Sequence, residues 1–292
     1  MALSAACGLP GTHALNLTPG KRAEHIRNIL DQVFAHDTRG GINPLEGEFL
    51  IARLLESQPR CVAEIGTAAG VSTAIILKAL DLLPHPKDFF AFEYLTYCYF
   101  APEREPGYLV GLTYDELPSY YHPNWGIGSA DMGKAMEGKG QIDFLLIDGN
   151  HSHPWATLDT ICALPYLADN ALLVYHDINL HLIGSERSKD EYGPHLLFYH
   201  FPGLEKITLG VSLPNIGAFR LDGSPQAALP HLLEVLYSHE WVPNSWPTLD
   251  LEAIKTPAEV IKKYLGVRQK AYLLEFMQAY LENRNTHMPT GA

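Results

Sequence analysis

The chain has 292 residues, of which 21 are Lys or Arg and 33 are Asp or Glu, so its formal net charge is −12. Hydrophobic residues make up 47 % and charged residues 18 %, which is typical of a folded globular protein and too apolar for a disordered one. An acidic chain without a run of Lys and Arg is a poor ligand for nucleic acids and for anionic membranes. We therefore expect neither as a partner.

The sequence predicts a cytoplasmic protein with reduced thiols. No apolar run approaches the roughly 20 residues that span a bilayer. The N-terminus has no basic segment, and Gly8, Pro10 and Gly11 interrupt its apolar residues, so it does not resemble a secretory signal. The four cysteines are widely spaced and form no CxxC pair: Cys7, Cys61, Cys98 and Cys162. Cys61 and Cys162 lie in apolar segments, where we expect buried thiols.

Two helices are predicted before the first strand. Residues 18–38 begin with Thr18, which can cap a helix, and Pro19, which suits a first turn. Apolar residues then recur on one helical face. Residues 45–57 show the same clustering. These two segments form a predicted N-terminal helical segment, residues 1–58, on the side of the acceptor.

From Cys61 onward, short apolar runs alternate with amphipathic segments. Strands are predicted at 61–65, 89–93, 142–147, 171–175, 206–211 and 217–221, with a weaker candidate at 125–128. Helices are predicted at 72–83, 131–138 and 154–168. This alternation predicts βαβ units and a doubly wound α/β sheet covered by helices on both faces, over residues 59–222.

Residues 223–292 form a predicted C-terminal helical extension. Apolar residues recur at helical spacing over 257–284, with an interruption near Gly266. We expect this stripe to pack on the core, and the alternative is a dimer surface or a lid.

The first strand runs directly into the turn EIGTAAGVS. Gly66 and Gly70 allow a tight turn and the close approach of a ligand, and a helix that begins near Ser72 presents free N–H groups. Ala68 stands where the dinucleotide fingerprint has its middle glycine. Glu64 would repel a pyrophosphate but suits a cationic amine or sulfonium, which favours S-adenosylmethionine over NAD, ATP or FAD. The alternative is an ordinary strand-to-helix turn with a solvated Glu64.

Acidic residues end three of the predicted strands. Glu93 ends the second strand, where an acid can accept hydrogen bonds from ribose hydroxyls. Asp148 and Asp177 end two later strands, and carboxylates on adjacent strand ends can chelate a hard cation such as Mg²⁺. His151 follows closely and could remove a proton from a substrate hydroxyl. Six of the fourteen histidines lie within fifty residues: His151, His153, His176, His181, His195 and His200.

Five segments together carry a family resemblance: AEIGTAAGVSTA, AFEY, GSADMGKAM, DFLLIDGNHSH and LLVYHD. Their order and spacing resemble those of class I S-adenosylmethionine-dependent methyltransferases. Over residues 43–221 the chain is similar to the small-molecule O-methyltransferase branch, methyltransferase family 24, which includes macrolide-sugar methyltransferases. The resemblance implies a Rossmann-like methyltransferase fold with a mostly parallel seven-stranded sheet, and S-adenosylmethionine as cofactor.

The resemblance also implies roles for individual residues. The cofactor loop would contain Glu64, Gly66, Thr67, Gly70 and Ser72. Glu93 would hold the ribose, and Asp148 would face both the cofactor and a metal. The residues that line the adenine would be Ser129, Ala130 and Asp131.

At the metal the chain departs from the family pattern. Asp177 would be the second metal ligand, and His151 matches the position at which some members carry the general base. Many metal-dependent relatives have two adjacent acidic or amide residues at the end of this strand. Here Ile178 follows Asp177 and cannot bind a metal. The third ligand would be Asn179 or His176, with altered geometry.

Residues 94–122 hold seven of the fifteen tyrosines. Such a segment near a cofactor could stack on a ring-bearing acceptor and bind its hydroxyls. The alternative is that it packs against the N-terminal helices or a partner subunit.

We therefore predict an S-adenosylmethionine-dependent O-methyltransferase that acts on a hydroxyl of a small molecule, a sugar-bearing or phenolic natural product. A divalent metal, expected to be Mg²⁺, would assist. The first alternative is a metal-dependent oxygenase on a related scaffold, with histidines and Asp177 holding iron. The second is a cofactor-binding protein that has lost turnover, and Ala68 disfavours a nicotinamide oxidoreductase. The sequence leaves a homo-oligomer open and does not identify the acceptor.

Overall fold

The computed structural model describes residues 18–38, 41–85, 87–242 and 249–287. Cys7 and the N-terminal apolar stretch considered above lie outside these residues. Within them, Cys61, Cys98 and Cys162 are free and buried, as expected for Cys61 and Cys162. The described helices include none that is long and apolar enough to cross a membrane.

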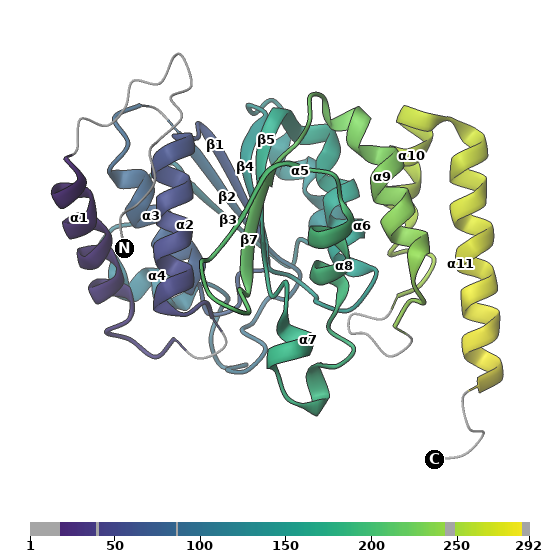
Figure 1. Ribbon diagram of the computed structural model, residues 1–292, viewed down its shortest axis with the longest axis horizontal. Coiled ribbons are helices and arrows are strands. Elements are labelled where there is room, and N and C mark those ends of the chain that lie inside the picture. The colour runs from purple at the N-terminus through teal and green to yellow at the C-terminus, as the bar shows by residue number, and fades with distance from the viewer. Residues whose placement is uncertain (1–17, 39–40, 86, 243–248, 288–292) are drawn as a thin grey trace.

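A seven-stranded sheet forms the centre of the fold (Figure 1). Its strands are β1 (Cys61–Ile65), β2 (Asp88–Glu93), β3 (Tyr121–Trp125), β4 (Ile142–Ile147), β5 (Leu167–His176), β6 (Leu204–Thr208) and β7 (Ile216–Arg220). Their order across the sheet is β3-β2-β1-β4-β5-β7-β6. The first five are parallel, and β7 runs antiparallel to both neighbours. The predicted doubly wound, mostly parallel seven-stranded sheet is confirmed.

The strand register brings the functional segments to one edge. Ile65 at the end of β1 pairs with Phe92 of β2 and Ile147 of β4. The residues that follow these three strands therefore leave the sheet side by side. Ile147 in turn pairs with Tyr175 of β5, so the end of β5 joins the same edge. Ligands of open α/β sheets bind at this carboxyl edge.

Four helices cover one face of the sheet: α1 (Pro19–Val33), α2 (Pro44–Ser57), α3 (Val71–Asp81) and α4 (Tyr108–Thr113) (Figure 1). The Thr18 side chain accepts a hydrogen bond from the backbone N–H of Lys21, as expected of the cap of α1. Helix α2 begins with a capping box in which Asn43 and Glu46 bond each other's backbone. Helices α1 and α2 pack on α3 and share its apolar core.

The other face carries α5 (Gly133–Met136), α6 (Trp155–Ala163), α8 (Gly193–His200), α9 (Pro225–Ser238), α10 (Lys255–Leu265) and α11 (Val267–His287). The short helix α7 (Leu180–Ile183) follows β5 and projects beyond the sheet (Figure 1). Single 3-10 turns occur at η1 (Ser129–Asp131), η2 (Leu164–Tyr166) and η3 (Glu186–Ser188). The expected break near Gly266 separates α10 from α11. Leu273 and Met277 of α11 are fully buried, so the C-terminal stripe packs on the core.

Several predicted boundaries are wrong for identifiable reasons. The helix predicted over 154–168 ends at Ala163, because Pro165 cannot continue it, and β5 begins already at Leu167. The helix predicted over 131–138 is reduced to the four residues of α5. The weak strand predicted over 125–128 lies instead at β3, which contains Pro123. A proline is tolerated there because β3 is an edge strand.

Candidate active site

The turn after β1 requires glycine at two positions. Gly66 and Gly70 have φ angles of +92° and +91°. A Cβ atom on Gly66 would lie 2.1 Å from the carbonyl oxygen of Asp148, and one on Gly70 would lie 2.7 Å from the Cα of Gly107. The turn thus passes directly against the end of β4 and against the segment before α4. Both glycines are needed for close approach as well as for conformation.

Glu93 at the end of β2 holds this turn. Its Oε2 atom accepts hydrogen bonds from the backbone N–H groups of Thr67 and Ala68, each at 3.0 Å. Its Oε1 atom accepts from the N–H of Leu95 at 3.2 Å. Ala68 itself has a positive φ of 46°, which this clamp helps to maintain. The structure thus brings Thr67 and Glu93 into direct contact.

Glu64 and Ser72 form a buried contact beneath the turn. The Glu64 carboxylate is 0 % exposed and accepts hydrogen bonds from Ser72 Oγ at 2.5 Å and Thr73 Oγ1 at 2.7 Å. Burial raises the pKa of Glu64 to about 8, in spite of these two hydrogen bonds. Glu64 is therefore not solvated, contrary to the alternative, and its buried carboxyl group faces Ser72 and Thr73. The contact between Glu64 and Ser72 thus connects β1 to α3.

The three residues expected at the adenine lie in η1, after β3. Ser129 donates a hydrogen bond at 2.5 Å to Asp159, a buried acid of α6 whose pKa burial raises to about 6. Asp131 is exposed and pairs with Lys134 at 2.7 Å. Ala130 is half-buried. The sequence did not indicate Asp159, because a single acid in an otherwise apolar helix gives no sign that Ser129 is its partner.

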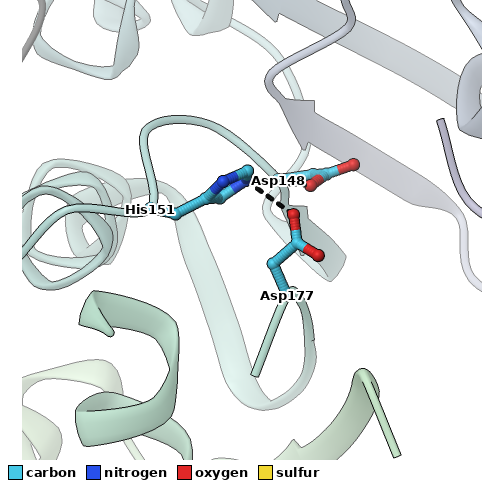
Figure 2. A group of neighbouring side chains, drawn as sticks. All are labelled: Asp148, His151 and Asp177. Atoms are coloured by element: carbon cyan, nitrogen blue, oxygen red, sulfur yellow. Dashed lines mark ion pairs between the residues drawn. The ribbon is translucent and has the colours of Figure 1, made fainter. Parts of the chain in front are cut away.

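Asp148, His151 and Asp177 meet at the carboxyl edge (Figure 2). The imidazole points between the two carboxylates, with Nε2 3.0 Å from Asp177 Oδ2 and 3.5 Å from Asp148 Oδ1. One ligand atom from each residue lies within 4.8 Å of the others. Burial alone would lower the pKa of His151, but the charges of Asp177 and Asp148 outweigh it and raise the pKa to about 10.

His176 extends this group toward helix α2. Its Nδ1 atom donates a hydrogen bond to Asp148 Oδ1 at 3.0 Å and lies 3.5 Å from Asp177 Oδ2. Its Nε2 atom lies 3.3 Å from Oε2 of Glu46. Burial opposes a charge on the ring, yet the carboxylates of Asp148 and Asp177 hold the pKa of His176 well above its usual value. In turn, the positive charges of His176 and His151 hold the pKa of Asp177 well below its ordinary range, although burial opposes this.

Asn215 holds Asp177 in an unusual backbone conformation. Asp177 has a φ of +58°, which is uncommon for a residue other than glycine. Its Oδ1 atom accepts a hydrogen bond at 2.5 Å from Nδ2 of Asn215, in the segment before β7. Ile178 donates its N–H to the carbonyl oxygen of Asn215, which fixes the turn from the other side. No sequence pattern indicated Asn215.

Asn179, expected as the third metal ligand, is bonded elsewhere. Its amide donates hydrogen bonds to the carbonyl oxygen of Pro214 at 2.6 Å and to the hydroxyl of Tyr199 at 3.1 Å. His195, expected to be structural, lies beside it with Nδ1 3.2 Å from Asn179 Oδ1. Two imidazoles therefore face the two carboxylates, that of His151 and that of His176, the other residue expected as third ligand.

The donor set fits a divalent cation. Two carboxylates supply the oxygen ligands that hard cations prefer, and imidazole nitrogen also suits Mn²⁺, Fe²⁺ and Zn²⁺. The Nε2 atom of His151 is buried and has no aligned hydrogen-bond acceptor, although it faces both carboxylates. A cation bound by the two carboxylates would offset the negative charge that this nitrogen faces.

The tyrosine-rich segment divides into two groups. Tyr114 and Tyr120 donate hydrogen bonds to Asp81 at the end of α3, so this part packs on α3 rather than on the N-terminal helices or the partner subunit that the alternative named. Tyr97 and Tyr99 are exposed. Tyr99 packs edge-on against the ring of Phe100, with ring centroids 4.9 Å apart.

Comparison with known proteins shows similarity to methyltransferases. Residues 63–178 match the model of the family Methyltransf_24, described as a methyltransferase domain. Two curated relatives, each named transmembrane O-methyltransferase, come from Propithecus coquereli and Macaca mulatta. Each is 39 % identical over 70 residues, or 24 % of this chain, and the match covers 24 % and 22 % of their own lengths. The chain thus spans about a quarter of the relatives that it matches.

Solved structures of methyltransferases are also similar. The SAH-bound methyltransferase PaMTH1 of Podospora anserina has a TM-score of 0.48 and 11 % identity, over 68 % of this chain and 88 % of that one. The O-methyltransferase TomG of Streptomyces achromogenes, in complex with SAM, has a TM-score of 0.47 and 15 % identity, over 68 % and 90 %. The matched segment 63–178 runs from β1 through the end of β5 and contains the glycine turn, Glu93, Asp148 and Asp177. Over this segment the chain is similar to the methyltransferase domain that the family model describes.

Proposed function

We propose that the protein is an S-adenosylmethionine-dependent O-methyltransferase acting on a hydroxyl group of a small molecule. The observation that carries this proposal is the group Asp148, His151 and Asp177, which lies at the same sheet edge as the glycine turn and Glu93. In the reaction a bond forms between the acceptor oxygen and the methyl carbon, while the bond from that carbon to sulfur breaks. S-adenosylhomocysteine leaves, and the acceptor proton passes to a base.

The cofactor is assigned to the turn between β1 and α3. Gly66 and Gly70 leave the backbone uncovered there, and Glu93 presents a carboxylate beside it. A carboxylate at the end of the second strand is suited to accept hydrogen bonds from ribose hydroxyls. Since Glu93 also bonds two N–H groups of the turn, cofactor binding and the shape of the turn would depend on one side chain. Glu64 supports the turn from beneath rather than touching the cofactor.

A divalent cation would be held by Asp148 and Asp177, with His151 beside them. Bound there, it would supply a Lewis acid that lowers the pKa of the acceptor hydroxyl. The two carboxylates lie on adjacent strands, and Asn215 and His176 fix their orientation. Catalysis by methyl transfer depends above all on alignment, and these contacts provide it for the acceptor side.

His151 is the proposed general base. With a pKa raised to about 10, its Nε2 atom holds a proton at neutral pH. It can accept the acceptor's proton only after that first proton has left. A cation that offsets the charge of Asp148 and Asp177 would favour this loss.

The proposed acceptor is a sugar-bearing or phenolic natural product. The exposed rings of Tyr97 and Tyr99, in the segment that follows Glu93, support an acceptor with a ring, because exposed aromatic side chains can stack on it. A metal-dependent oxygenase is less well supported. The facial site of such enzymes takes two histidines and one carboxylate. Here two carboxylates, Asp148 and Asp177, form the centre of the group, and Nδ1 of His176 already donates a hydrogen bond to Asp148.

The test is methyl transfer itself. Purified protein is incubated with S-adenosylmethionine and a panel of catechols, flavonoids and glycosides, and the release of S-adenosylhomocysteine is measured with Mg²⁺ and with EDTA. We expect acceptor-dependent release that EDTA suppresses and Mg²⁺ restores. Release that EDTA leaves unchanged would remove the metal from the proposal. Tight cofactor binding without transfer to any acceptor would favour a binding protein instead.

A further inference from the structure

We propose that Glu46 is a positioning residue of this site: from helix α2 it holds the ring of His176, and through that ring it orients the carboxylate of Asp148. Glu46 lies outside the matched methyltransferase domain, in the N-terminal part of the chain. The proposal deepens the proposed function and rests on it, since it concerns the orientation of a residue assigned to the acceptor side.

One oxygen atom of Glu46, Oε2, makes the two contacts on which the proposal rests. Glu46 lies in the first turn of α2 and is only 4 % exposed. Its Oε2 atom accepts a hydrogen bond at 2.7 Å from the backbone N–H of Asn43. The same Oε2 atom lies 3.3 Å from Nε2 of His176. A single carboxylate oxygen therefore faces both the start of the helix and the imidazole.

The ring of His176 lies between two carboxylates. Nδ1 donates a hydrogen bond to Oδ1 of Asp148 at 3.0 Å, whereas Nε2 is buried, has no aligned hydrogen bond and faces Glu46 as an ion-pair partner at 3.3 Å. The hydrogen bond at Nδ1 alone leaves the ring free to tilt, and the charge of Glu46 on the opposite side restricts that tilt. The same Oδ1 atom of Asp148 faces His151 at 3.5 Å. A rotation of His176 would thus displace the carboxylate around which the site is built.

Helix capping alone does not explain the place of Glu46. The side chain of Asn43 already accepts hydrogen bonds from the N–H groups of Leu45 and Glu46. Glu46 adds one bond to the backbone of Asn43, which an exposed side chain at the same position could also make. Burying a carboxylate is costly unless a partner compensates it, and His176 is the partner that the structure provides. Stabilising the start of α2 therefore does not account for the contact between Glu46 and His176.

Three variants separate positioning from capping. Glu46→Ala removes the oxygen that faces His176 and also breaks the capping box. Asn43→Ala breaks the capping box from the other side and leaves Glu46 in place, so it is the matched control for helix stability. Glu46→Gln keeps one carbonyl oxygen, which can occupy the place of Oε2 and serve both partners. It is the conservative variant that should rescue a positioning role.

Two readouts are used on the full chain. The first is the nuclear magnetic resonance spectrum of histidine labelled with nitrogen-15, in which His176 is assigned from the His176→Gln variant. The second is kinetics with S-adenosylmethionine and 3,4-dihydroxybenzoate as the acceptor probe, together with calorimetric affinity for S-adenosylhomocysteine. We expect Glu46→Ala to shift the ring resonances of His176. We also expect it to lower kcat by about 10- to 100-fold, since a misplacement near 1 Å can cost about 100-fold.

The affinity for S-adenosylhomocysteine should stay unchanged in all three variants, and Glu46→Gln should resemble the parent protein in both readouts. Asn43→Ala should lower the melting temperature about as much as Glu46→Ala but leave kcat and the ring resonances unchanged. Unmoved His176 resonances in Glu46→Ala would overturn the proposal, and so would an equal loss of kcat in Asn43→Ala. If the parent protein bound no S-adenosylhomocysteine and transferred no methyl group, the proposed function would fail. The His176 spectra would still decide whether Glu46 holds the ring.

Discussion

Replacing Gly66 with alanine tests the close approach between the turn and β4. Its ideal Cβ would lie 2.1 Å from the carbonyl oxygen of Asp148, about 1.3 Å short of the 3.4 Å at which ordinary contact begins. Neither group is a flexible side chain, so the ends of β1 and β4 must separate. That movement strains the hydrogen bond from Asp148 N–H to Ile65 at 2.8 Å. A backbone hydrogen bond contributes about 1 kcal/mol.

The control for this variant is Gly266→Ala. Gly266 has the same φ of +92°, with ψ of 177°, but nothing within 4 Å of its Cβ position, so an alanine there meets backbone strain and no clash. Strain in this glycine-only region costs about 1–3 kcal/mol. At roughly 2 °C per kcal/mol, Gly266→Ala should melt about 2–6 °C below the parent protein. Gly66→Ala adds the backbone clash to the strain of a positive φ, and we expect a larger loss.

The assay is differential scanning fluorimetry with calorimetric titration of S-adenosylhomocysteine. Gly66→Ala should bind the ligand weakly or not at all, because the displaced turn is the proposed cofactor site. Gly266→Ala should bind it like the parent protein. Equal melting temperatures for the two variants, or unchanged affinity in Gly66→Ala, would refute the reasoning.

Three further predictions concern single acids. Glu93→Gln loses the charged acceptor beside the turn and should raise the Kd of S-adenosylhomocysteine by about tenfold or more, because hydrogen bonds to charged groups contribute about 1.5–3 kcal/mol. The control is Asp88→Asn at the far end of β2. An equal rise in Kd in both variants would contradict the assignment of Glu93 to the cofactor. Burial raises the pKa of Glu64 from 4.5 to about 8, so its contribution to the free energy of unfolding is complete below pH 4.5 and declines as the pH rises to about 8. Urea unfolding should therefore show Glu64→Gln gaining stability relative to the parent protein between pH 5 and pH 8, and a difference independent of pH would contradict the buried acid. Asp177→Asn should weaken Mn²⁺ binding measured by electron paramagnetic resonance, and unchanged Mn²⁺ affinity would move the cation site away from this pair.

Much of the fold could be predicted from local patterns. The parallel strands are continuous apolar runs with helical segments between them, and a chain of that kind has few alternatives. β3 was misplaced because Pro123 interrupts it, and only its position at the sheet edge makes that proline acceptable. The acids at the strand ends were found for the same reason, since each directly follows a clear apolar run.

The rest of the site depends on contacts that no local pattern encodes. Glu64 lies in a strand that is buried along its whole length, so no alternation indicates that its side chain points toward α3. Glu46 reaches His176 across 130 positions of the sequence, and Asn215 reaches Asp177 across 38. Asp177 has a positive φ, which sets the direction of the turn that follows it. In that turn the side-chain amide of Asn179 donates hydrogen bonds to Pro214 and Tyr199. Sequence adjacency therefore did not indicate that the amide of Asn179 is engaged by Pro214 and Tyr199.

The most direct measurement is isothermal titration calorimetry of the unmodified protein with S-adenosylhomocysteine, with NAD⁺ as the control ligand. The account predicts saturable binding of one S-adenosylhomocysteine per chain and no heat of binding with NAD⁺, because Ala68 stands where the dinucleotide fingerprint has its middle glycine. Absence of binding to S-adenosylhomocysteine, or binding of NAD⁺ in its place, would contradict the account.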